Sequence, residues 1–270
     1  MKPIVTLTTD FGAQDWFVGV MKGVILSRAP AASIVDLTHE IPPGDVRAAA
    51  FVLRSSLECF PAGTIHVVVV DPGVGSDRRA LGIRTDSAVL LGPDNGVLSW
   101  ASPEESGWSA RQLTNSRLWR GSPSATFHGR DIFAPVAGFL AHGGRFERIG
   151  DEVTTWWRLP WPEPRERRGR LHGQVLYVDR FGNAITNLPG SATTALAMAG
   201  RRVWVEYAAG RRCELKPCYA AVGPGEPVAV VGSTGFVELA VNGGHAANRL
   251  GLRAGSPVLL GRSRAAATRR

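Results

Sequence analysis

Hydrophobic and polar positions in the first half of the chain alternate between short apolar runs and stretches of helical periodicity. The apolar runs Ile4–Thr9, 34–37 and 65–70 are rich in β-branched residues and end at polar or glycine-rich turns, which predicts strands. Between them, apolar residues recur at helical spacing over 16–28, and residues 45–60 form a segment rich in alanine that predicts a helix. This βαβαβ order predicts an α/β domain whose mainly parallel sheet is flanked by helices.

The same α/β pattern continues to about residue 160. Two further strands are predicted at 80–84 and 88–91, and a helix at 133–140. Prolines and charged residues are then concentrated between residues 156 and 170, which is typical of a domain boundary. We therefore expect an N-terminal domain over 1–160, a linker over 161–171 and a C-terminal domain over 172–270.

The second half consists of short β-like segments separated by glycine-rich turns. The predicted strands are 173–179, 202–207, 228–231, 236–241 and 257–260. Short strands with such turns are typical of a smaller all-β domain, folded as an antiparallel sandwich or barrel.

Composition and charge narrow the class of protein. The chain has 270 residues, 44% of them hydrophobic, and a formal net charge of +8 that comes almost entirely from arginine. The dense basic stretches at 165–170 and 262–270 fit a solvated linker and a chain end better than a nucleic-acid surface, so we expect no nucleic-acid partner.

The sequence also bears on location and redox chemistry. No apolar run approaches the roughly 20 residues that span a bilayer, and residues 1–9 do not resemble a signal peptide, so we expect a cytoplasmic protein with no membrane partner. Cys59, Cys213 and Cys218 are odd in number and lack zinc-ligand spacing, which indicates structural roles.

The stretch Thr64–Arg79 is the most informative part of the chain. Its apolar strand ends in Asp71 and a glycine-rich turn that carries Arg78 and Arg79. Ligand sites of open α/β sheets lie beyond the carboxyl ends of such strands, so Asp71 and Arg78 are candidate site residues. A turn cap paired with an arginine is the structural alternative.

Other polar clusters adjoin predicted strand ends or turns. They are TTDFG at 8–12, with Asp15 nearby; TFHGRD at 126–131; DRFGNAITN at 179–187; and residues 232–244. Common nucleotide-binding, serine-hydrolase and zinc-protease motifs are absent from the sequence. Asp10, Asp71, His128 and Asp131 form a possible metal-ligand set, although Arg78 and Arg130 would compete with a cation there.

At these clusters, the sequence resembles a known family, the S-adenosyl-L-methionine (SAM) hydroxide adenosyltransferases, which are SAM hydrolases related to the SAM-dependent fluorinase and chlorinase. Six motifs carry the resemblance in order: TTDFG at 8–12, VDPGVGSDRR at 70–79, GPDNG at 92–96, TFHGRDIFAP at 126–135, DRFGNAITN at 179–187 and VNGG at 241–244. It implies an α/β N-terminal domain, a β-barrel C-terminal domain and hydrolysis of SAM to adenosine and L-methionine.

The resemblance separates a hydrolase from a halogenase. The family hydrolases carry an Asp-Arg-His set that Asp71, Arg78 and His128 match, whereas the fluorinase has tyrosines at the positions of Asp71 and His128. A carboxylate in a halide pocket would repel the ion, which favours water as the nucleophile. A halogenase and a non-catalytic nucleoside- or SAM-binding protein are the alternative readings.

The chemistry of the leaving group suggests a mechanism. Methionine departs from the sulfonium as a neutral thioether and needs no general acid. We therefore expect no metal and no cofactor, with SAM as substrate. Arg78 and His128 would fix and polarise one water in line with the carbon–sulfur bond, and Asp71 would orient the water or accept its proton. The sequence does not single out which of the three takes the proton.

The resemblance also implies substrate-binding residues. Asp10 would accept the ribose hydroxyls, Asp71 would touch the ribose, and Asp15 and Asp179 would meet the methionine ammonium. The remaining positions expected to contact substrate are Phe127, Phe181, Asn183, Ser233, Glu238 and Val241. Thr234 stands where the fluorinase has an arginine. Family members form trimers with active sites between subunits, so we expect a homotrimer.

Overall fold

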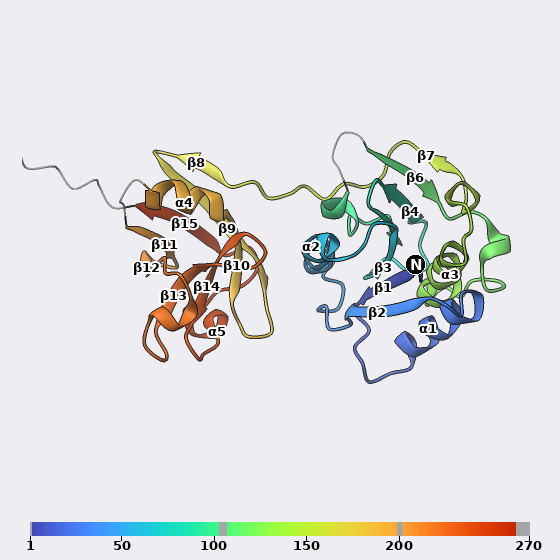
Figure 1. Cartoon of the computed structure of the whole chain (residues 1–270), viewed down its shortest axis with the longest axis horizontal. Coiled ribbons are helices and arrows are strands. Elements are labelled where there is room, and N and C mark those ends of the chain that lie inside the picture. The colour runs from blue at the N-terminus through green and yellow to red at the C-terminus, as the bar shows by residue number, and fades with distance from the viewer. Residues whose placement is uncertain (1, 103–106, 199–201, 263–270) are drawn as a thin grey trace, which may run out of the picture. The chain divides into compact units, whose positions relative to one another are not determined.

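The computed structural model describes residues 2–102, 107–198 and 202–262, which divide into two compact units at Pro160/Trp161 (Figure 1). Each unit is built on its own sheet. Within the described ranges, no helix has both the length and the apolar character needed to cross a membrane.

The first unit contains a mixed sheet with strand order β2-β1-β3-β5-β4-β6-β7. The strands are β1 (Ile4–Thr9), β2 (Ser33–Thr38), β3 (Thr64–Val69), β4 (Ala80–Thr85), β5 (Ala88–Pro93), β6 (Trp108–Gln112) and β7 (Glu152–Val153). Strands β2, β1, β3 and β5 pair in parallel, as expected from the βαβαβ pattern. Strands β4, β6 and β7 extend this sheet by antiparallel pairing.

The expectation of a mainly parallel sheet is therefore correct only for one half of it. Strand β4 ends at Thr85 and β5 begins at Ala88. A link this short can join only antiparallel neighbours, because a parallel connection needs a crossover of a dozen or more residues. The predicted strands 80–84 and 88–91 already leave only three residues between them, so the antiparallel pairing of this hairpin could have been predicted from the sequence.

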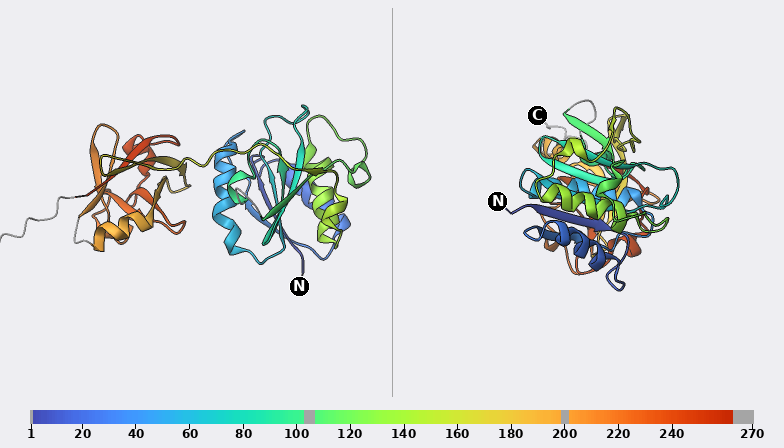
Figure 2. Two further views of the ribbon diagram at one scale, coloured as in Figure 1. Left: turned by 90° about the horizontal axis from the view of Figure 1, so that it is seen from above. Right: turned by 90° about the vertical axis from the view of Figure 1, so that its right-hand side faces the viewer.

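Helices cover both faces of this sheet (Figure 2). Helices α1 (Phe17–Arg28) and α3 (Ala134–Ala141) pack together on one face, and α2 (Val46–Ser56) lies on the other. Asp45 caps α2 by accepting a hydrogen bond from the Ala48 backbone N–H at 2.9 Å. The shorter helical turns of the chain are Leu57–Cys59, Ser99–Ala101, Ser116–Leu118, Gly129–Phe133, Phe146–Arg148 and Tyr219–Ala221.

The second unit is a nearly closed, barrel-like antiparallel sheet. Its strands are β8 (Arg165–Arg167), β9 (Arg170–Val178), β10 (Ala184–Pro189), β11 (Val203–Tyr207), β12 (Arg211–Glu214), β13 (Pro227–Val231), β14 (Phe236–Val241) and β15 (Pro257–Arg262), with the order β12-β11-β15-β9-β10-β14-β13 and β8 beside β9. A bridge between Leu215 and Ala229 brings the two outer strands together. Helices α4 (Gly190–Met198) and α5 (Ala246–Leu250) complete the unit.

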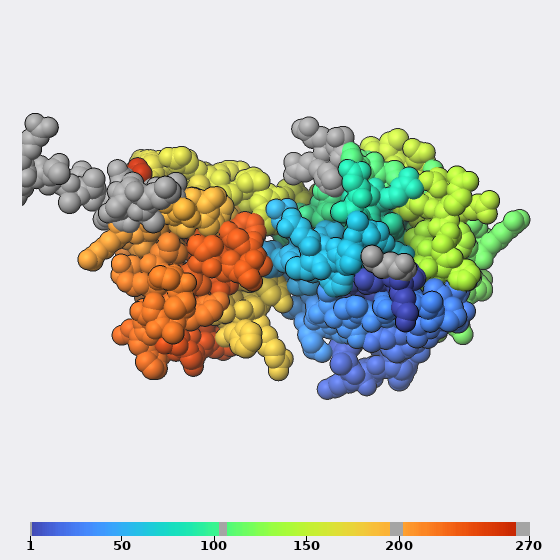
Figure 3. All heavy atoms as spheres, viewed as in Figure 1, coloured from blue at the N-terminus to red at the C-terminus, as the bar shows by residue number. Residues whose placement is uncertain are grey.

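The segment expected to be a linker, 161–171, instead folds with the second unit. Strand β8 pairs with β9 across a turn in which Arg168 and Gly169 both have positive φ angles. The Trp161 ring lies 5.6 Å from that of Phe236, centroid to centroid. The arginines of β8 are exposed, and the yellow spheres of this region lie at the surface in Figure 3, which agrees with their expected solvation.

The order of the strands creates a binding crevice in the first unit. The chain leaves β1 through α1 to reach β2 on one side, and then returns through α2 to β3 on the other side. The carboxyl ends of β1 and β3 therefore flank a topological switch point, where α/β sheets bind ligands. Asp10 directly follows β1, and Asp71 lies two residues beyond β3.

Candidate functional site

A cavity of about 420 Å³ lies at this switch point in the first unit. Four of the predicted site residues line it: Asp10, Asp71, Phe127 and His128. Asp10 and Asp71 come from the ends of β1 and β3, whereas Phe127 and His128 come from the turn before the Gly129–Phe133 helical turn. Residues far apart in the sequence therefore meet at one edge of the sheet.

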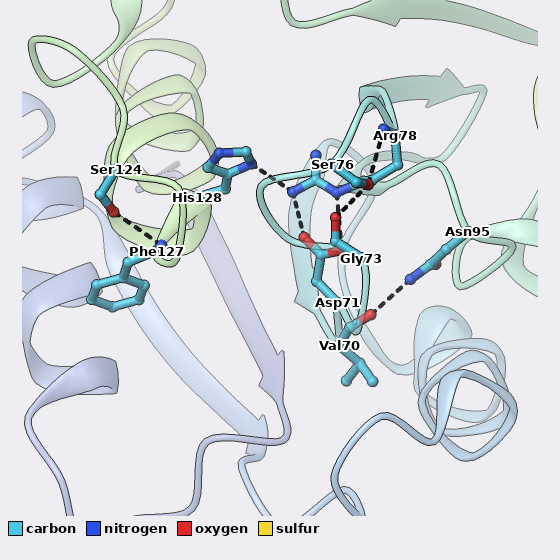
Figure 4. Close-up of polar contacts among 9 residues, drawn as sticks. All are labelled: Val70, Asp71, Gly73, Ser76, Arg78, Asn95, Ser124, Phe127 and His128. Carbon is cyan, nitrogen blue, oxygen red and sulfur yellow. Dashed lines mark hydrogen bonds and ion pairs between the residues drawn. The ribbon is translucent and has the colours of Figure 1, made fainter.

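Arg78 joins Asp71 to His128 (Figure 4). Its Nε donates to Asp71 Oδ1 at 2.9 Å, and its Nη2 donates to Asp71 Oδ2. The same Nη2 lies 2.6 Å from His128 Nδ1. The side chains of Arg78 and Asp71 are only 10% and 5% exposed, so this ion pair is shielded from water. The structure thus brings together the three residues expected to be catalytic.

The hydrogen-bond roles of this group follow from the chemistry of the guanidinium. Arginine has five N–H donors and no acceptor, so His128 Nδ1 must accept the bond from Arg78. An imidazole that accepts at Nδ1 and is neutral carries its proton on Nε2. The group therefore presents an N–H donor on His128 and a carboxylate on Asp71, both on residues that line the cavity.

The surroundings of His128 favour this neutral form. Burial lowers the pKa of His128 below its ordinary value of 6.5, and the positive charge of Arg78 lowers it further. The carboxylates of Asp71 and Asp131 act in the opposite direction without reversing the shift.

A tight turn positions Asp71 and Arg78. The Val74 backbone N–H donates to the Asp71 carbonyl at 3.1 Å, and Ser76 Oγ accepts from the Arg78 backbone N–H at 3.3 Å. Gly75 has a φ angle of +80°, and a Cβ at this position would lie 2.3 Å from the Ala125 carbonyl oxygen. Only glycine therefore fits where this turn meets the segment that carries His128.

The loop after β1 fixes Asp10. Asp10 Oδ2 accepts from the Gly44 backbone N–H at 2.8 Å. Thr9 Oγ1 lies 2.9 Å from His39 Nδ1, and the Gly12 N–H donates to the His39 carbonyl at 2.8 Å. Asp15, in contrast, is exposed and does not line the cavity, so the structure of this unit does not join it to the other predicted residues.

The alternative of a metal site at Asp10, Asp71, His128 and Asp131 does not match this geometry. Both oxygens of Asp131 accept from Arg130, and Oδ2 also accepts from the Ser124 backbone N–H. Over the described ranges, no three or more histidine, cysteine or acidic side chains gather so as to hold a metal ion.

The second unit has its own cavity, of about 680 Å³. All six residues predicted to bind substrate from this half of the chain line it: Asp179, Phe181, Asn183, Ser233, Glu238 and Val241. Asn183 holds Asp179 through two hydrogen bonds, from its backbone N–H at 2.8 Å and its side-chain Nδ2 at 3.0 Å. Phe181 is 77% exposed and offers a free aromatic face.

This second cavity is acidic. Glu238 is 5% exposed, and Tyr219 donates a hydrogen bond to its carboxyl group. Burial raises the pKa of Glu238; the bond from Tyr219 opposes this shift and the charge of Asp179 adds to it. The lining contains no lysine or arginine. The cavity is therefore suited to a cationic ligand or to one that is rich in N–H donors.

The predicted substrate contacts did not include Ile185, Gly243 and Gly244 of this cavity, which lie in the quoted motifs, or Tyr219, which lies outside them. Tyr219 follows a proline and a cysteine in a region without a strand pattern, so only its aromatic character could have drawn attention to it. Thr234, singled out as a departure from the fluorinase, also lines the cavity, and its buried hydroxyl makes no hydrogen bond within the described part of the chain.

The protein thus combines an α/β unit and a barrel-like β unit, and each unit has a polar cavity. Family models for the N-terminal and C-terminal domains of SAM hydroxide adenosyltransferase match residues 5–150 and 173–259. The chain therefore belongs to the SAM hydroxide adenosyltransferase family, as the sequence motifs predicted.

Individual relatives agree with this assignment. The chain is 42% identical to a Salinispora tropica protein named (R)-S-adenosyl-L-methionine hydrolase, over 94% of this chain and 95% of that protein. It is 27% identical to a fluorinase of Actinoplanes, over 95% and 96% of the two chains. The crystal structure of an uncharacterized conserved protein from Thermotoga maritima superposes with a TM-score of 0.88 at 37% identity and covers 95% of this chain and 99% of that one.

Proposed function

We propose that this protein is an enzyme that hydrolyses SAM to adenosine and L-methionine by attack of water on the 5′ carbon of the ribose. Relatives that are about 40% identical over nearly the full chain and carry the name (R)-S-adenosyl-L-methionine hydrolase support this function. The observation that carries it is the Arg78 bridge between Asp71 and His128 at the wall of a cavity.

In the proposed reaction, a water molecule lies between the His128 Nε2–H and the Asp71 carboxylate, in line with the carbon–sulfur bond. An electron pair of the water oxygen forms the new bond to the 5′ carbon, and the pair of the carbon–sulfur bond moves onto sulfur. Methionine leaves as a neutral thioether. Asp71 accepts the proton released from the water, because His128 in its neutral form has its only acceptor nitrogen bonded to Arg78.

Arg78 would act on the water only through Asp71 and His128. It is not among the residues that line the cavity, and its Nε and Nη2 are engaged by Asp71 and His128. The prediction that Arg78 itself contacts the water is therefore replaced by the proposal that it orients the two groups that do. The reaction as proposed needs no metal or other cofactor, because the sulfonium is already an activated leaving group.

The remaining predicted residues would bind the substrate. Asp10 keeps one carboxylate oxygen for the ribose hydroxyls while Gly44 holds the other. The aromatic faces of Phe181 and Tyr219 and the polar groups of Asn183, Ser233 and Glu238 would receive the nucleoside, and the carboxylate of Asp179 would attract the methionine ammonium. Contact between Asp15 and the methionine ammonium stays a prediction.

We also propose that the active enzyme is a homotrimer in which one substrate contacts two subunits. The family resemblance supports this arrangement, and the predicted substrate contacts other than Asp15 line one cavity in each unit. Mixing two inactive variants, Asp71→Asn and Asn183→Ala, tests it. Recovery of activity on mixing supports shared sites, and no recovery in a mixed oligomer refutes them. A cytoplasmic location stays a prediction.

Incubation of the purified protein with SAM, with and without chloride, tests the function. Chromatography should show adenosine and L-methionine in equal amounts in both conditions. Formation of 5′-chloroadenosine would make the protein a halogenase instead, and SAM that is retained unreacted would make it a binding protein. Asp71→Asn should abolish turnover.

A further inference from the structure

Asp131 is a buried charge beside the proposed catalytic group, although it does not line the cavity. The residue is only 1% exposed. Burying a carboxylate is costly unless it is paired and hydrogen-bonded. Hydrogen bonds from Arg130 and Ser124 outweigh the effect of burial and keep the pKa of Asp131 below its ordinary value.

Asp131 is hydrogen-bonded to the turn that carries His128 through its side chain and its backbone N–H, and its backbone carbonyl accepts from the Arg120 N–H at 3.0 Å. Oδ2 accepts from the Ser124 backbone N–H at 2.9 Å, and Ser124 Oγ in turn accepts from the Phe127 backbone N–H at 3.0 Å. The Asp131 backbone N–H donates to the Phe127 carbonyl at 3.2 Å. The carboxylate therefore holds the start of the turn 124–128, and the Asp131 backbone N–H holds its Phe127 end.

Arg130 adds a second connection to the same turn. Its Nε and Nη2 donate to the two oxygens of Asp131 at 2.6 and 2.9 Å. The guanidinium also lies over the Phe127 ring, 5.3 Å from its centroid. Asp131 thus fixes Arg130, which covers Phe127, while Phe127 and His128 both line the cavity.

We propose that Asp131 is a positioning residue for His128: it holds the turn 124–128 in the geometry that places the imidazole beside Arg78, and its negative charge acts on that imidazole. This inference rests on the proposed function, because it assigns a role in the same site.

The charges that face His128 come from two segments. Arg78 and Asp71 belong to the turn after β3, and Asp131, with its partner Arg130, belongs to the helical turn that follows His128. Arg78 opposes protonation of His128, whereas Asp71 and Asp131 favour it. Removing the charge of Asp131 therefore lowers the pKa of His128, while a purely structural role for Asp131 leaves it unchanged.

The test compares four variants in the full-length protein. Asp131→Asn keeps the size of the side chain but removes its charge. Arg130→Gln breaks the same ion pair but keeps the carboxylate and its bond from Ser124. Ser124→Ala removes the hydroxyl that holds Phe127 and leaves the charge intact. Asp131→Glu restores the charge and serves as a rescue.

We expect Asp131→Asn to lower kcat by at least about tenfold, with a change in KM of less than about threefold, and to move the acid limb of the kcat profile to lower pH. Arg130→Gln should lower kcat less than Asp131→Asn does, because it keeps the carboxylate and its bond from Ser124, and Ser124→Ala should lower kcat without moving the acid limb. Asp131→Glu should recover part of the loss.

Titration of the His128 imidazole by NMR provides a readout that needs no turnover. Its midpoint should fall in Asp131→Asn and stay near the wild-type value in Ser124→Ala. The proposal is overturned if Asp131→Asn lowers only thermal stability, with kcat per folded molecule and the His128 midpoint unchanged. If the wild type does not hydrolyse SAM, the proposed function fails, and the titration still decides whether Asp131 acts on His128.

Discussion

The Nη2 atom of Arg78 lies 2.6 Å from Nδ1 of His128, and this contact fixes the direction of the hydrogen bond between them. Because a guanidinium only donates, the imidazole is the acceptor and is neutral. The same nitrogen also donates to Asp71, so a single arginine sets the orientation of a base and a donor at the cavity wall.

Replacing Arg78 with lysine should abolish this arrangement. An ammonium is a point charge and cannot reproduce the two parallel bonds to Asp71 together with the bond to His128. We expect Arg78→Lys to lower kcat roughly 100-fold, with a smaller effect on KM. Steady-state kinetics with SAM measures both values.

Arg79→Lys is the matched control for that variant. Arg79 occupies the next position, but it pairs with Asp94 at 2.6 Å and donates to the Thr155 carbonyl at 2.8 Å, outside the cavity lining. The kcat of Arg79→Lys should stay within about threefold of the wild-type value. An equal loss of kcat in Arg79→Lys and Arg78→Lys would contradict a special role for Arg78.

Activity should fall on the acid side of neutrality. His128 must be neutral to accept from Arg78, and its folded-state pKa lies below 6.5 because of burial and the charge of Arg78. His128 is therefore half-protonated only at a pH below 6.5, and the midpoint of the acid decline of kcat should lie below pH 6.5. A kcat profile measured from acid to neutral pH checks this. A midpoint above pH 6.5 would refute the assignment.

Gly75→Ala should destabilise the first unit strongly. The substitution combines a positive φ angle with a Cβ placed 2.3 Å from the Ala125 carbonyl oxygen. We expect the free energy of unfolding to fall by more than about 2 kcal/mol. Gly121→Ala is the control, because Gly121 also has a positive φ angle but a Cβ there meets no atom within 4 Å. Thermal unfolding should show a clearly larger loss of stability in Gly75→Ala than in Gly121→Ala.

His66 should make the stability of the protein depend on pH. The side chain is fully buried in β3, its Nδ1 lies 2.8 Å from Thr6 Oγ1, and burial lowers its pKa to about 4. Between pH 6.5 and about 4, the unfolded chain binds a proton that the folded protein does not bind, so stability falls as the pH decreases through this range.

Over that range, the lowered pKa of His66 corresponds to a loss of roughly 3 kcal/mol in the free energy of unfolding. Denaturant unfolding at several pH values should show a shallower acid loss for His66→Gln than for the wild type. His142→Gln, at an exposed position, should keep the wild-type slope. Parallel curves for the wild type and His66→Gln would contradict the prediction.

The fold could be predicted where the apolar pattern is strong. Strand β1 has the predicted bounds, and α1 and β14 differ from prediction by a residue at most. Strand β10 was missed because four of its six residues belong to the polar motif DRFGNAITN, although five of the six are buried. Polar side chains such as Asn187 are buried there because they bond to the backbone, which no hydrophobic pattern reveals.

The site was predicted mainly through motifs. The strand ends alone indicated Asp10 and Asp71, because the carboxyl ends of parallel strands meet at one edge of a sheet. His128 lies 50 residues from Arg78 in sequence, and no periodicity predicts their contact. The shielded position of Arg78 and the contribution of Tyr219 depend on side-chain packing and became visible only in the structure.

The central claim is that water attacks the 5′ carbon at the site formed by Asp71 and His128. The most direct measurement is mass spectrometry of the products after the reaction is run in water enriched in the heavy oxygen isotope. The heavy isotope should appear in the 5′ hydroxyl of adenosine and not in methionine. Adenosine without the label, or a 5′-halogenated nucleoside in its place, would contradict the account.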